Sequence, residues 1–181
     1  MDYVALLRGI NVGGRNKVDM KRLAAVMTAA GFEDVSTYIN TGNIFFSAGE
    51  AEAGEAAGRL EELLAAEFGV TARALVRSAD NLRRLAAAIP SEWANDDRMK
   101  VDVMFLWPKY DDAGVLDRLD IKPAIDDVRY RESALIWQVD RRNLTRSGLM
   151  KLPGTDAYAN MTVRNCNTVR KIAERLAGGG R

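Results

Sequence analysis

Apolar positions near the start of the chain change from a continuous run to a helical spacing. Tyr3 to Leu7 is a short apolar run without alternation, which predicts a strand that is buried on both faces. From Met20 to Ala30 apolar residues recur along one helical face, and Gly31 follows. Because Asp19 is a good N-cap residue, a helix is predicted to begin directly after it.

The residues from Val35 to Arg77 continue the alternation of strands and helices. Val35 to Ser47 contains two β-rich runs around the Asn-Thr-Gly-Asn sequence of Asn40 to Asn43, a pattern typical of a hairpin. Leucines at helical spacing predict a helix over Glu50 to Phe68, and Thr71 to Arg77 reads as another strand. The predicted order is β-α-β-β-α-β, which matches a ferredoxin-like α+β sandwich.

This topology places two separate segments at the same end of a sheet. With right-handed crossovers, the first and second strands run parallel and the third runs antiparallel between them. The loop from Arg8 to Lys17 and the turn from Asn40 to Asn43 therefore lie at the same end. We expect Arg8 or Asn11 to contact that turn.

The second half of the chain begins with a similar pattern. Val101 to Trp107 is again a buried type of strand, and Asp127 to Arg141 alternates apolar and polar residues as a second hairpin does. A terminal helix is predicted over Val163 to Ala177. We therefore expect an α+β protein with two ferredoxin-like (βαββα-type) halves, residues 1–90 and 91–181, in which helices pack on one face of each antiparallel sheet.

Composition narrows the chemistry more than it narrows the fold. The 181 residues are 48% hydrophobic and 28% charged, which is typical of a soluble globular protein. The sequence shows neither a membrane-length apolar run nor a signal-peptide pattern, and its single cysteine fits a reducing cytoplasm. The absence of histidine excludes Ser-His and Cys-His nucleophiles and His-ligated zinc. We predict a cytoplasmic protein without a cofactor or metal.

The net charge of +1 hides a strong segregation along the chain. Residues 1–22 carry +3 and residues 141–181 carry +7, whereas residues 23–140 carry −9. The two basic ends would form one positive surface if the fold brings them together. The alternative is that they form two unrelated solvated faces.

The loop LLRGINVGGRNKV, from Leu6 to Val18, combines glycines, asparagines and cations. Part of it approaches the phosphate-binding pattern G-x-x-x-x-G-K-[ST], but with Arg in place of Lys and Asn in place of the hydroxyl residue. Glycines let backbone N–H groups turn toward an anion that basic side chains neutralise. The alternative is a plain turn with solvated cations. The candidate ligand-binding residues here are Arg8, Asn11, Gly13, Gly14, Arg15 and Lys17.

Two further segments complete the candidate site. The asparagines of the hairpin turn either bond their own backbone or contact a polar ligand. MTVRNCNTVRKI, from Met161 to Ile172, is predicted to begin a helix capped by Thr162, whose positive start favours an anion. The candidate residues of these segments are Asn40, Asn43, Arg164, Asn165, Asn167 and Lys171.

Cys166 lies between the two asparagines of the third segment. Cations and a helix start lower the pKa of a thiol, which raises the possibility of a nucleophile. However, Cys166 falls on the apolar stripe of the predicted helix and no histidine exists to activate it. We predict a buried packing residue.

RGINVGGRNKV, YINTGN and TVRNCNTVRK, in this order and spacing, resemble the bacterial domain-of-unknown-function family 1697. The resemblance extends over essentially the whole chain. It implies that the three motifs form one unit, and it implies no activity, because the family has none established. Members of the family usually carry Trp where this chain has Cys166, and an aromatic residue there fits packing rather than thiol chemistry.

Taken together, these features predict a protein that binds a small phosphate-bearing or other anionic ligand, such as a nucleotide or a phosphorylated metabolite. Nucleic-acid binding through phosphate contacts is an alternative. A second alternative is an enzyme that uses magnesium held by Asp111-Asp112 or Asp126-Asp127, and a third is a protein-interaction module.

Overall fold

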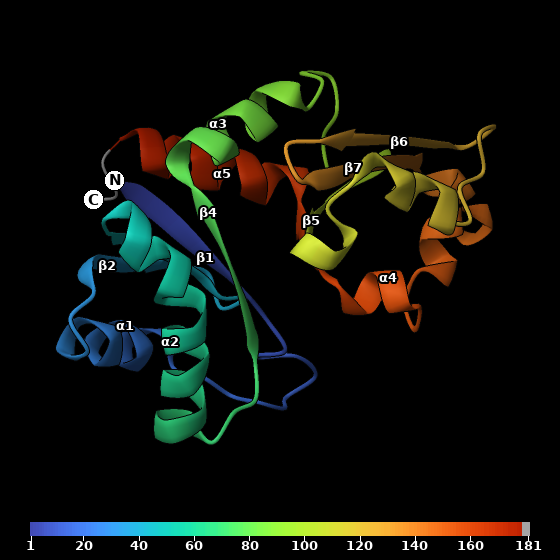
Figure 1. Cartoon of the computed structure of the whole chain (residues 1–181). Coiled ribbons are helices and arrows are strands. Elements are labelled where there is room, and N and C mark those ends of the chain that lie inside the picture. The colour runs from blue at the N-terminus through green and yellow to red at the C-terminus, as the bar shows by residue number, and fades with distance from the viewer. Residues whose placement is uncertain (179–181) are drawn as a thin grey trace. The chain divides into compact units, whose positions relative to one another are not determined.

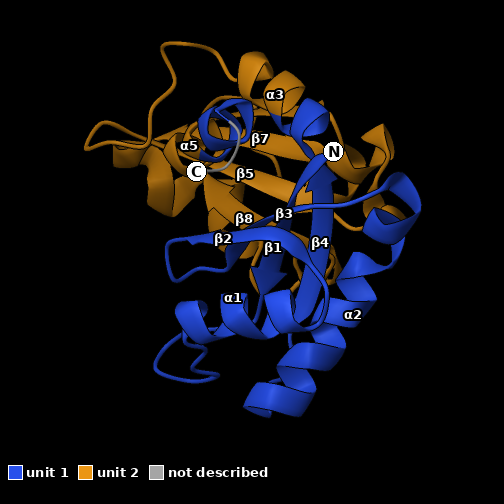
Figure 2. Cartoon of the chain, turned by 90° about the vertical axis from the view of Figure 1, so that its left-hand side faces the viewer, with its two compact units in different colours: residues 1–82, 172–181 blue, residues 83–171 orange. Residues whose placement is uncertain are grey.

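The structure, a computed structural model, describes residues 1–178 (Figure 1). The chain folds into two units, which Figure 2 distinguishes by colour. Unit 1 contains Met1–Leu82 together with the residues from Ile172 onward, and unit 2 contains Arg83–Lys171. The chain passes from one unit to the other twice, within the helices over residues 79–88 and 166–177. The predicted division into residues 1–90 and 91–181 stays a prediction.

The elements of unit 1 begin and end where local sequence signals place them. The carboxylate of Asp19 accepts hydrogen bonds from the backbone N–H groups of Lys21 (2.8 Å) and Arg22 (3.0 Å), which caps the first helix. Gly69 ends the second helix in the left-handed conformation, with φ of 63°. The elements are β1 (Asp2–Arg8), α1 (Met20–Ala29), β2 (Glu33–Tyr38), β3 (Asn43–Ser47), α2 (Glu50–Phe68), β4 (Arg73–Ser78) and the beginning of α3 (Ala79–Ala88), whose residues from Arg83 onward belong to unit 2.

The strands of unit 1 form a four-stranded sheet in the order β2-β3-β1-β4, with antiparallel pairs throughout. Tyr3, Ala5 and Leu7 of β1 share one core cluster with Leu23 of α1 and Leu60 of α2. Figures 1 and 2 show both helices on one side of the sheet. All five residues from Tyr3 to Leu7 are buried, which confirms the prediction of a strand covered on both faces.

Unit 2 repeats this strand order, as β6-β7-β5-β8, again with antiparallel pairs. Its elements are β5 (Met99–Leu106), β6 (Asp126–Arg131), β7 (Ala134–Asp140), α4 (Asp156–Ala159), β8 (Met161–Asn165) and the beginning of α5 (Cys166–Ala177), whose residues from Ile172 onward belong to unit 1. Unit 2 also has 3₁₀ segments at Pro108–Tyr110, Ala113–Arg118, Arg141–Arg146 and Gly148–Lys151. The prediction of an α+β chain with two antiparallel sheets is confirmed, and both strand orders are consistent with ferredoxin-like halves.

The core of unit 2 is covered by short turns where unit 1 has long helices. Met104 and Leu106 of β5 and Trp137 of β7 lie in one cluster with Val115 and Leu149, which come from two of the 3₁₀ segments. Trp137 is fully buried there. The face of the unit 2 sheet that carries Met104, Leu106 and Trp137 is therefore covered in part by 3₁₀ segments.

The predicted start of the last helix is wrong. Met161 to Asn165 is the edge strand β8, and the helix α5 begins only at Cys166. The β-branched residues Thr162 and Val163 pair with β5, and the side-chain oxygen of Asn165 accepts from the backbone N–H of Thr168 at 2.9 Å. Asn165, and not Thr162, therefore provides the side-chain cap.

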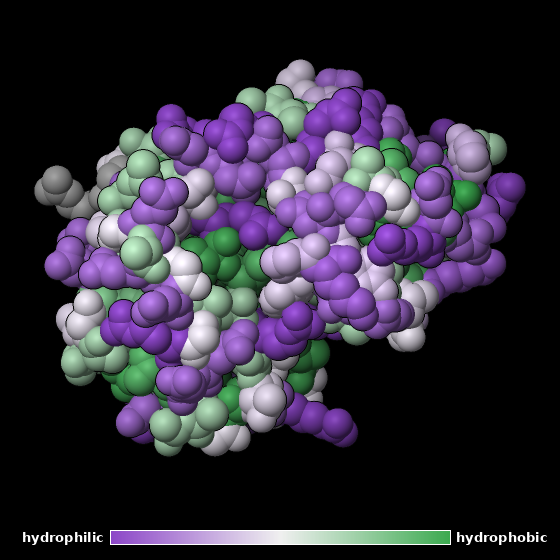
Figure 3. All heavy atoms as spheres, viewed as in Figure 1, coloured by the Kyte–Doolittle hydropathy of each residue, from purple (hydrophilic) through white to green (hydrophobic). Residues whose placement is uncertain are grey.

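Hydrophilic residues cover most of the face of the molecule that Figure 3 shows, with smaller apolar areas between them. Among the helices of residues 1–178, none combines the length and the apolar character that a membrane-spanning segment requires.

Candidate functional site

The loop after β1 and the turn between β2 and β3 meet at one end of the unit 1 sheet. The side-chain nitrogen of Asn11 donates to the backbone oxygen of Asn40 at 2.9 Å. The backbone N–H of Leu7 donates to the backbone oxygen of Gly42 at 2.8 Å. The predicted contact between Asn11 and the turn is therefore confirmed.

Within the loop, residues 11–16 form a miniature hairpin. The N–H of Arg15 donates to the oxygen of Val12, and the N–H of Asn11 donates to the oxygen of Asn16, each at 3.0 Å. Gly13 and Gly14 occupy the two central positions with φ of 57° and 77°. Two positive φ angles define the tight turn that joins twisted strands, and glycine adopts them without a steric cost.

Two asparagine side chains hold this hairpin in place. Asn11 donates to the oxygen of Val18 at 3.1 Å and accepts from its N–H at 2.8 Å. Asn16 donates to the oxygen of Gly9 at 2.7 Å. Both asparagines have positive φ, 52° and 51°, which Asn tolerates better than most residues. The carboxamide of Asn11, a candidate ligand contact, thus bonds the loop itself.

The outer part of the loop, Val12 to Lys17, is exposed, and we call it the cation turn. Neither Arg15 nor Lys17 has a side-chain hydrogen bond or ion pair with any residue in the described range 1–178. Val12 adds an apolar side chain that is 67% exposed. Arg8 is half-buried at the end of β1. The cation turn therefore presents two available positive charges on a fixed backbone.

The β2–β3 turn divides its two candidate asparagines between surface and interior. Asn40 is exposed, whereas Asn43 is fully buried and donates to the oxygen of Tyr38 (2.9 Å) and the hydroxyl of Thr41 (3.2 Å). Ile39, also in the turn, is 44% exposed and has φ of 50°. Asn40 is thus the surface carboxamide of this turn.

The third motif belongs largely to unit 2, and its first candidate residue is buried. Arg164 is only 7% exposed, and its guanidinium donates to the hydroxyl of Thr162 (3.1 Å) and the backbone oxygen of Val163 (2.8 Å). Burial lowers the pKa of Arg164 to about 10. The predicted place of Arg164 at a helix start is wrong, because this residue belongs to the strand β8, which turns its side chain inward.

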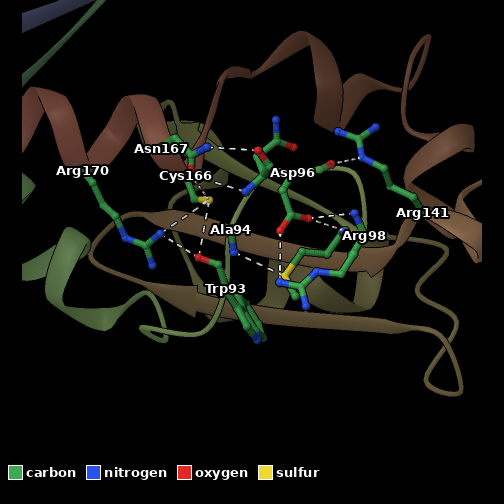
Figure 4. Close-up of polar contacts among 10 residues, drawn as sticks. Trp93, Ala94, Asp96, Arg98, Arg141, Cys166, Asn167 and Arg170 are labelled. Atoms are coloured by element: carbon green, nitrogen blue, oxygen red, sulfur yellow. Dashed lines mark hydrogen bonds and ion pairs between the residues drawn. The ribbon is translucent and has the colours of Figure 1, made fainter.

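The start of α5 holds the loop between α3 and β5 (Figure 4). The side-chain nitrogen of Asn167 donates to the backbone oxygen of Asn95 at 3.0 Å. Arg170 donates to the backbone oxygens of Trp93 (2.7 Å) and Pro90 (2.8 Å). Sequence reasoning did not single out Arg170, although its position one turn after Cys166 places both residues on the same side of the helix. Lys171, the last candidate, is exposed.

Cys166 is a packing residue, as predicted. Its side chain is fully buried, and its sulfur lies 3.9 Å from the backbone oxygen of Trp93 (Figure 4). Burial raises the pKa of the Cys166 thiol above its ordinary value, which keeps it protonated and unreactive at neutral pH.

The two acidic pairs proposed as magnesium ligands serve the fold of unit 2. Asp126 is buried and accepts from the backbone N–H groups of Lys122 and Gly148 and from the hydroxyl of Ser147. Asp127 forms an ion pair with a neighbouring arginine at 2.8 Å, and Asp111 accepts from the hydroxyl of a tyrosine at 2.8 Å. Within residues 1–178 no group of three or more acidic, Cys or His residues is arranged to hold a metal ion.

The candidate residues are thus divided between the two units. The loop and the β2–β3 turn come together in unit 1 and present cations to solvent, while the third motif mostly organises the backbone of unit 2. Among the side chains of the unit 1 candidates, those of Arg15, Lys17 and Asn40 are both exposed and chemically suited to an anion.

Comparison with known proteins adds a family to this geometry. A solved structure of a conserved bacterial protein from Streptococcus pneumoniae is similar to this chain, with a TM-score of 0.81 and 27% sequence identity, over 97% of this chain and 98% of that one. No curated protein matches the chain. The profile of the family described as "Protein of unknown function (DUF1697)" matches residues 1–137. The chain, whose RGINVGG and YINTGN motifs both fall within that match, belongs to this family.

Proposed function

We propose that unit 1 binds the phosphate groups of a ligand through the cation turn. The observation that supports this proposal is the state of Arg15 and Lys17, which are exposed and have no side-chain partner within residues 1–178. Both cations stand on a backbone that hydrogen bonds within the loop hold in place. A hydrogen bond from a charged group to phosphate contributes about 1.5–3 kcal/mol.

The fixed backbone favours binding because the turn loses little conformational entropy when a ligand binds. The bonds of Asn11 to Val18 and of Asn16 to Gly9 hold the turn before any ligand is present. Preorganisation of this kind lowers the entropic cost of association. The N–H groups of Gly13 and Gly14 make no backbone hydrogen bond within the described residues, so they too can face a phosphate.

The exposure of the turn favours nucleic acid over a compact metabolite. A methyl group placed on Gly13 or Gly14 would meet nothing within 4 Å. A compact ligand draws its affinity from a concave site that removes it from water, whereas a phosphodiester chain reaches a protruding turn easily. The exposed Val12 side chain can also contact a sugar or base at the same place. Nucleic-acid binding, which the sequence offered as an alternative, is therefore the form of the proposal that we favour.

The test compares binding of fluorescent single-stranded and duplex oligonucleotides with binding of ATP, over a range of salt concentrations. For single strands, each neutralised phosphate contributes about −0.7 to the slope of log affinity against log salt. The double substitution Arg15→Ala/Lys17→Ala should weaken oligonucleotide binding at low salt and flatten that slope by about 1.4. The double substitution Arg142→Ala/Arg146→Ala, which removes the same charge from exposed positions of unit 2, is the matched control.

An equal loss in both double variants would show that net charge, and not the turn, governs binding. Tight ATP binding that needs Arg15 and Lys17 would return the compact ligand to first place. If neither ligand binds at low salt, the exposed Val12 and Ile39 side chains would favour the protein-interaction alternative.

A further inference from the structure

A hollow of about 190 Å³ lies in unit 2, on the core-facing side of β5 and β8. Its apolar lining includes Met104 of β5 and Val163 of β8, together with Leu149, Leu152 and Tyr158 from the segment between β7 and β8. We call it the β5–β8 hollow. Its walls are almost entirely apolar, apart from one charged pair that also lines it.

The charged pair consists of Lys100 and Asp102, both from β5. Because they are two residues apart on a strand, their side chains project from the same face as Met104. The ammonium of Lys100 lies 2.9 Å from one carboxylate oxygen of Asp102, Oδ2. The Lys100 side chain is 30% exposed and that of Asp102 only 11%. A carboxylate at a core-facing position of a central strand is costly unless it is paired, and Lys100 provides that pairing.

Both members of the pair retain unused bonding capacity. Within residues 1–178, the other oxygen of Asp102, Oδ1, has no hydrogen-bond partner, and Lys100 contacts no acceptor besides Asp102. A lysine ammonium carries three donors and a carboxylate oxygen accepts up to two bonds. The pair thus offers one acceptor and two donors beside an apolar hollow.

We propose that the β5–β8 hollow binds a small apolar α-amino acid. Its ammonium bonds Oδ1 of Asp102, its carboxylate bonds the ammonium of Lys100, and its side chain lies among Met104, Leu152 and Val163. An apolar cavity of about 150 Å³ holds benzene, so the volume of about 190 Å³ suits a side chain of the size of leucine or methionine.

The pairing of charges favours a zwitterion over an ion of one sign. A bound anion would satisfy Lys100 but add uncompensated negative charge next to Asp102, and a bound amine would do the reverse at Lys100. A zwitterion adds no net charge and completes the bonding of both groups. Specificity therefore comes from two adjacent opposite charges followed by an apolar group.

The experiment is calorimetric titration of the full chain at neutral pH with L-leucine and three analogues. Isocaproate lacks the ammonium, isoamylamine lacks the carboxylate, and glycine lacks the apolar side chain. Leucine should bind saturably with a dissociation constant on the order of 0.1 mM. Each analogue should bind at least about tenfold more weakly, because it leaves a charged group unpaired or the hollow unfilled.

Two variants locate the binding in the hollow. Lys100→Met/Asp102→Leu replaces the pair with apolar side chains of similar size, and it should weaken leucine binding at least about tenfold without loss of fold. Val163→Trp fills the hollow from an edge strand and leaves the pair in place, so it should have the same effect. Its matched control is Val128→Trp on β6, a half-buried position that packs on the same core cluster but does not line the hollow.

The proposal is overturned if leucine binds no better than isocaproate or isoamylamine, or if Val163→Trp binds leucine as the unmodified chain does. It is also overturned if leucine shows no saturation at millimolar concentrations. Binding only of a peptide with an N-terminal leucine would overturn it too and indicate a protein partner at this place.

Discussion

Replacement of Gly42 by alanine tests how closely the β2–β3 turn approaches β1. Gly42 has φ of 84°, and its backbone oxygen accepts from Leu7. A methyl group at this position would lie 2.6 Å from Cβ of Leu7 and 2.9 Å from Cδ1 of Ile10. Both neighbours are buried core residues, so neither moves freely out of the way.

Two separate costs add at this position. A left-handed backbone conformation costs an alanine about 1–2 kcal/mol relative to glycine. Overpacking of a filled core costs about another 1–3 kcal/mol. Gly42→Ala should therefore lower the free energy of unfolding of unit 1 by about 2–5 kcal/mol.

Gly13→Ala supplies the control that separates the two costs. Gly13 also has positive φ, 57°, but a methyl group there meets nothing within 4 Å. It should carry only the conformational cost of about 1–2 kcal/mol. Substitution by asparagine tests the steric cost alone, because asparagine tolerates positive φ. Gly13→Asn should leave the free energy of unfolding nearly unchanged, whereas Gly42→Asn should still lower it strongly.

Urea denaturation followed by far-ultraviolet circular dichroism measures these differences, and amide hydrogen exchange assigns them to β1 and β3. The reasoning fails if Gly42→Ala and Gly13→Ala are equally destabilising. Equal costs would mean that the close approach of Gly42 to Leu7 is not part of the folded structure in solution.

Three further predictions concern unit 2 and its link to α5. Burial raises the pKa of the Cys166 thiol, so above a pH of about 8.5 the thiol loses its proton when the protein unfolds. The free energy of unfolding should therefore fall as the pH rises above that value, and Cys166→Ala should remove this contribution to the pH dependence. Thiol labelling should also be slow at neutral pH, and rapid labelling of the native protein would contradict the packing role. Arg170→Met should lower the free energy of unfolding by about 2–4 kcal/mol in urea denaturation, because the backbone oxygens of Trp93 and Pro90 lose charged donors. Arg170→Lys should restore only part of this stability. Asp126→Ala should cost about 3–5 kcal/mol, since three buried or half-buried donors lose their acceptor, and a cost below about 1 kcal/mol would show that they find other partners.

The elements that the sequence predicted well are those with local signals. α1 has its cap at Asp19, α2 has its terminating Gly69, and the run from Tyr3 to Leu7 forms the core of β1. β8 has no such signal. Its five residues are too short for a clear period, and they become a strand only because β5, some sixty residues earlier, pairs with them.

In the candidate site, too, some features could be predicted from the sequence and others could not. Topology alone predicted that Asn11 would meet the β2–β3 turn, because crossover handedness fixes which loops share a sheet end. For Asn43 the sequence left two alternatives open, and the structure shows the bond to the backbone. The sequence did not predict that the carboxamide of Asn11 would bond the backbone of its own loop, since this depends on a residue with φ of 52°. Asp102 had a usable signal, because it is a lone acid within the apolar run from Val101 to Trp107.

The strand orders have a consequence for how the chain is made. In each unit the central strand comes first in the sequence, and both of its neighbours come later, β3 and β4 for β1 and β7 and β8 for β5. During translation the most apolar strand of each unit therefore leaves the ribosome with nothing to pair with. Distant partners make folding slow, and unpaired apolar strands associate with other chains. We expect this chain to depend on chaperones or low temperature for a high yield of soluble protein, more than its ordinary composition suggests.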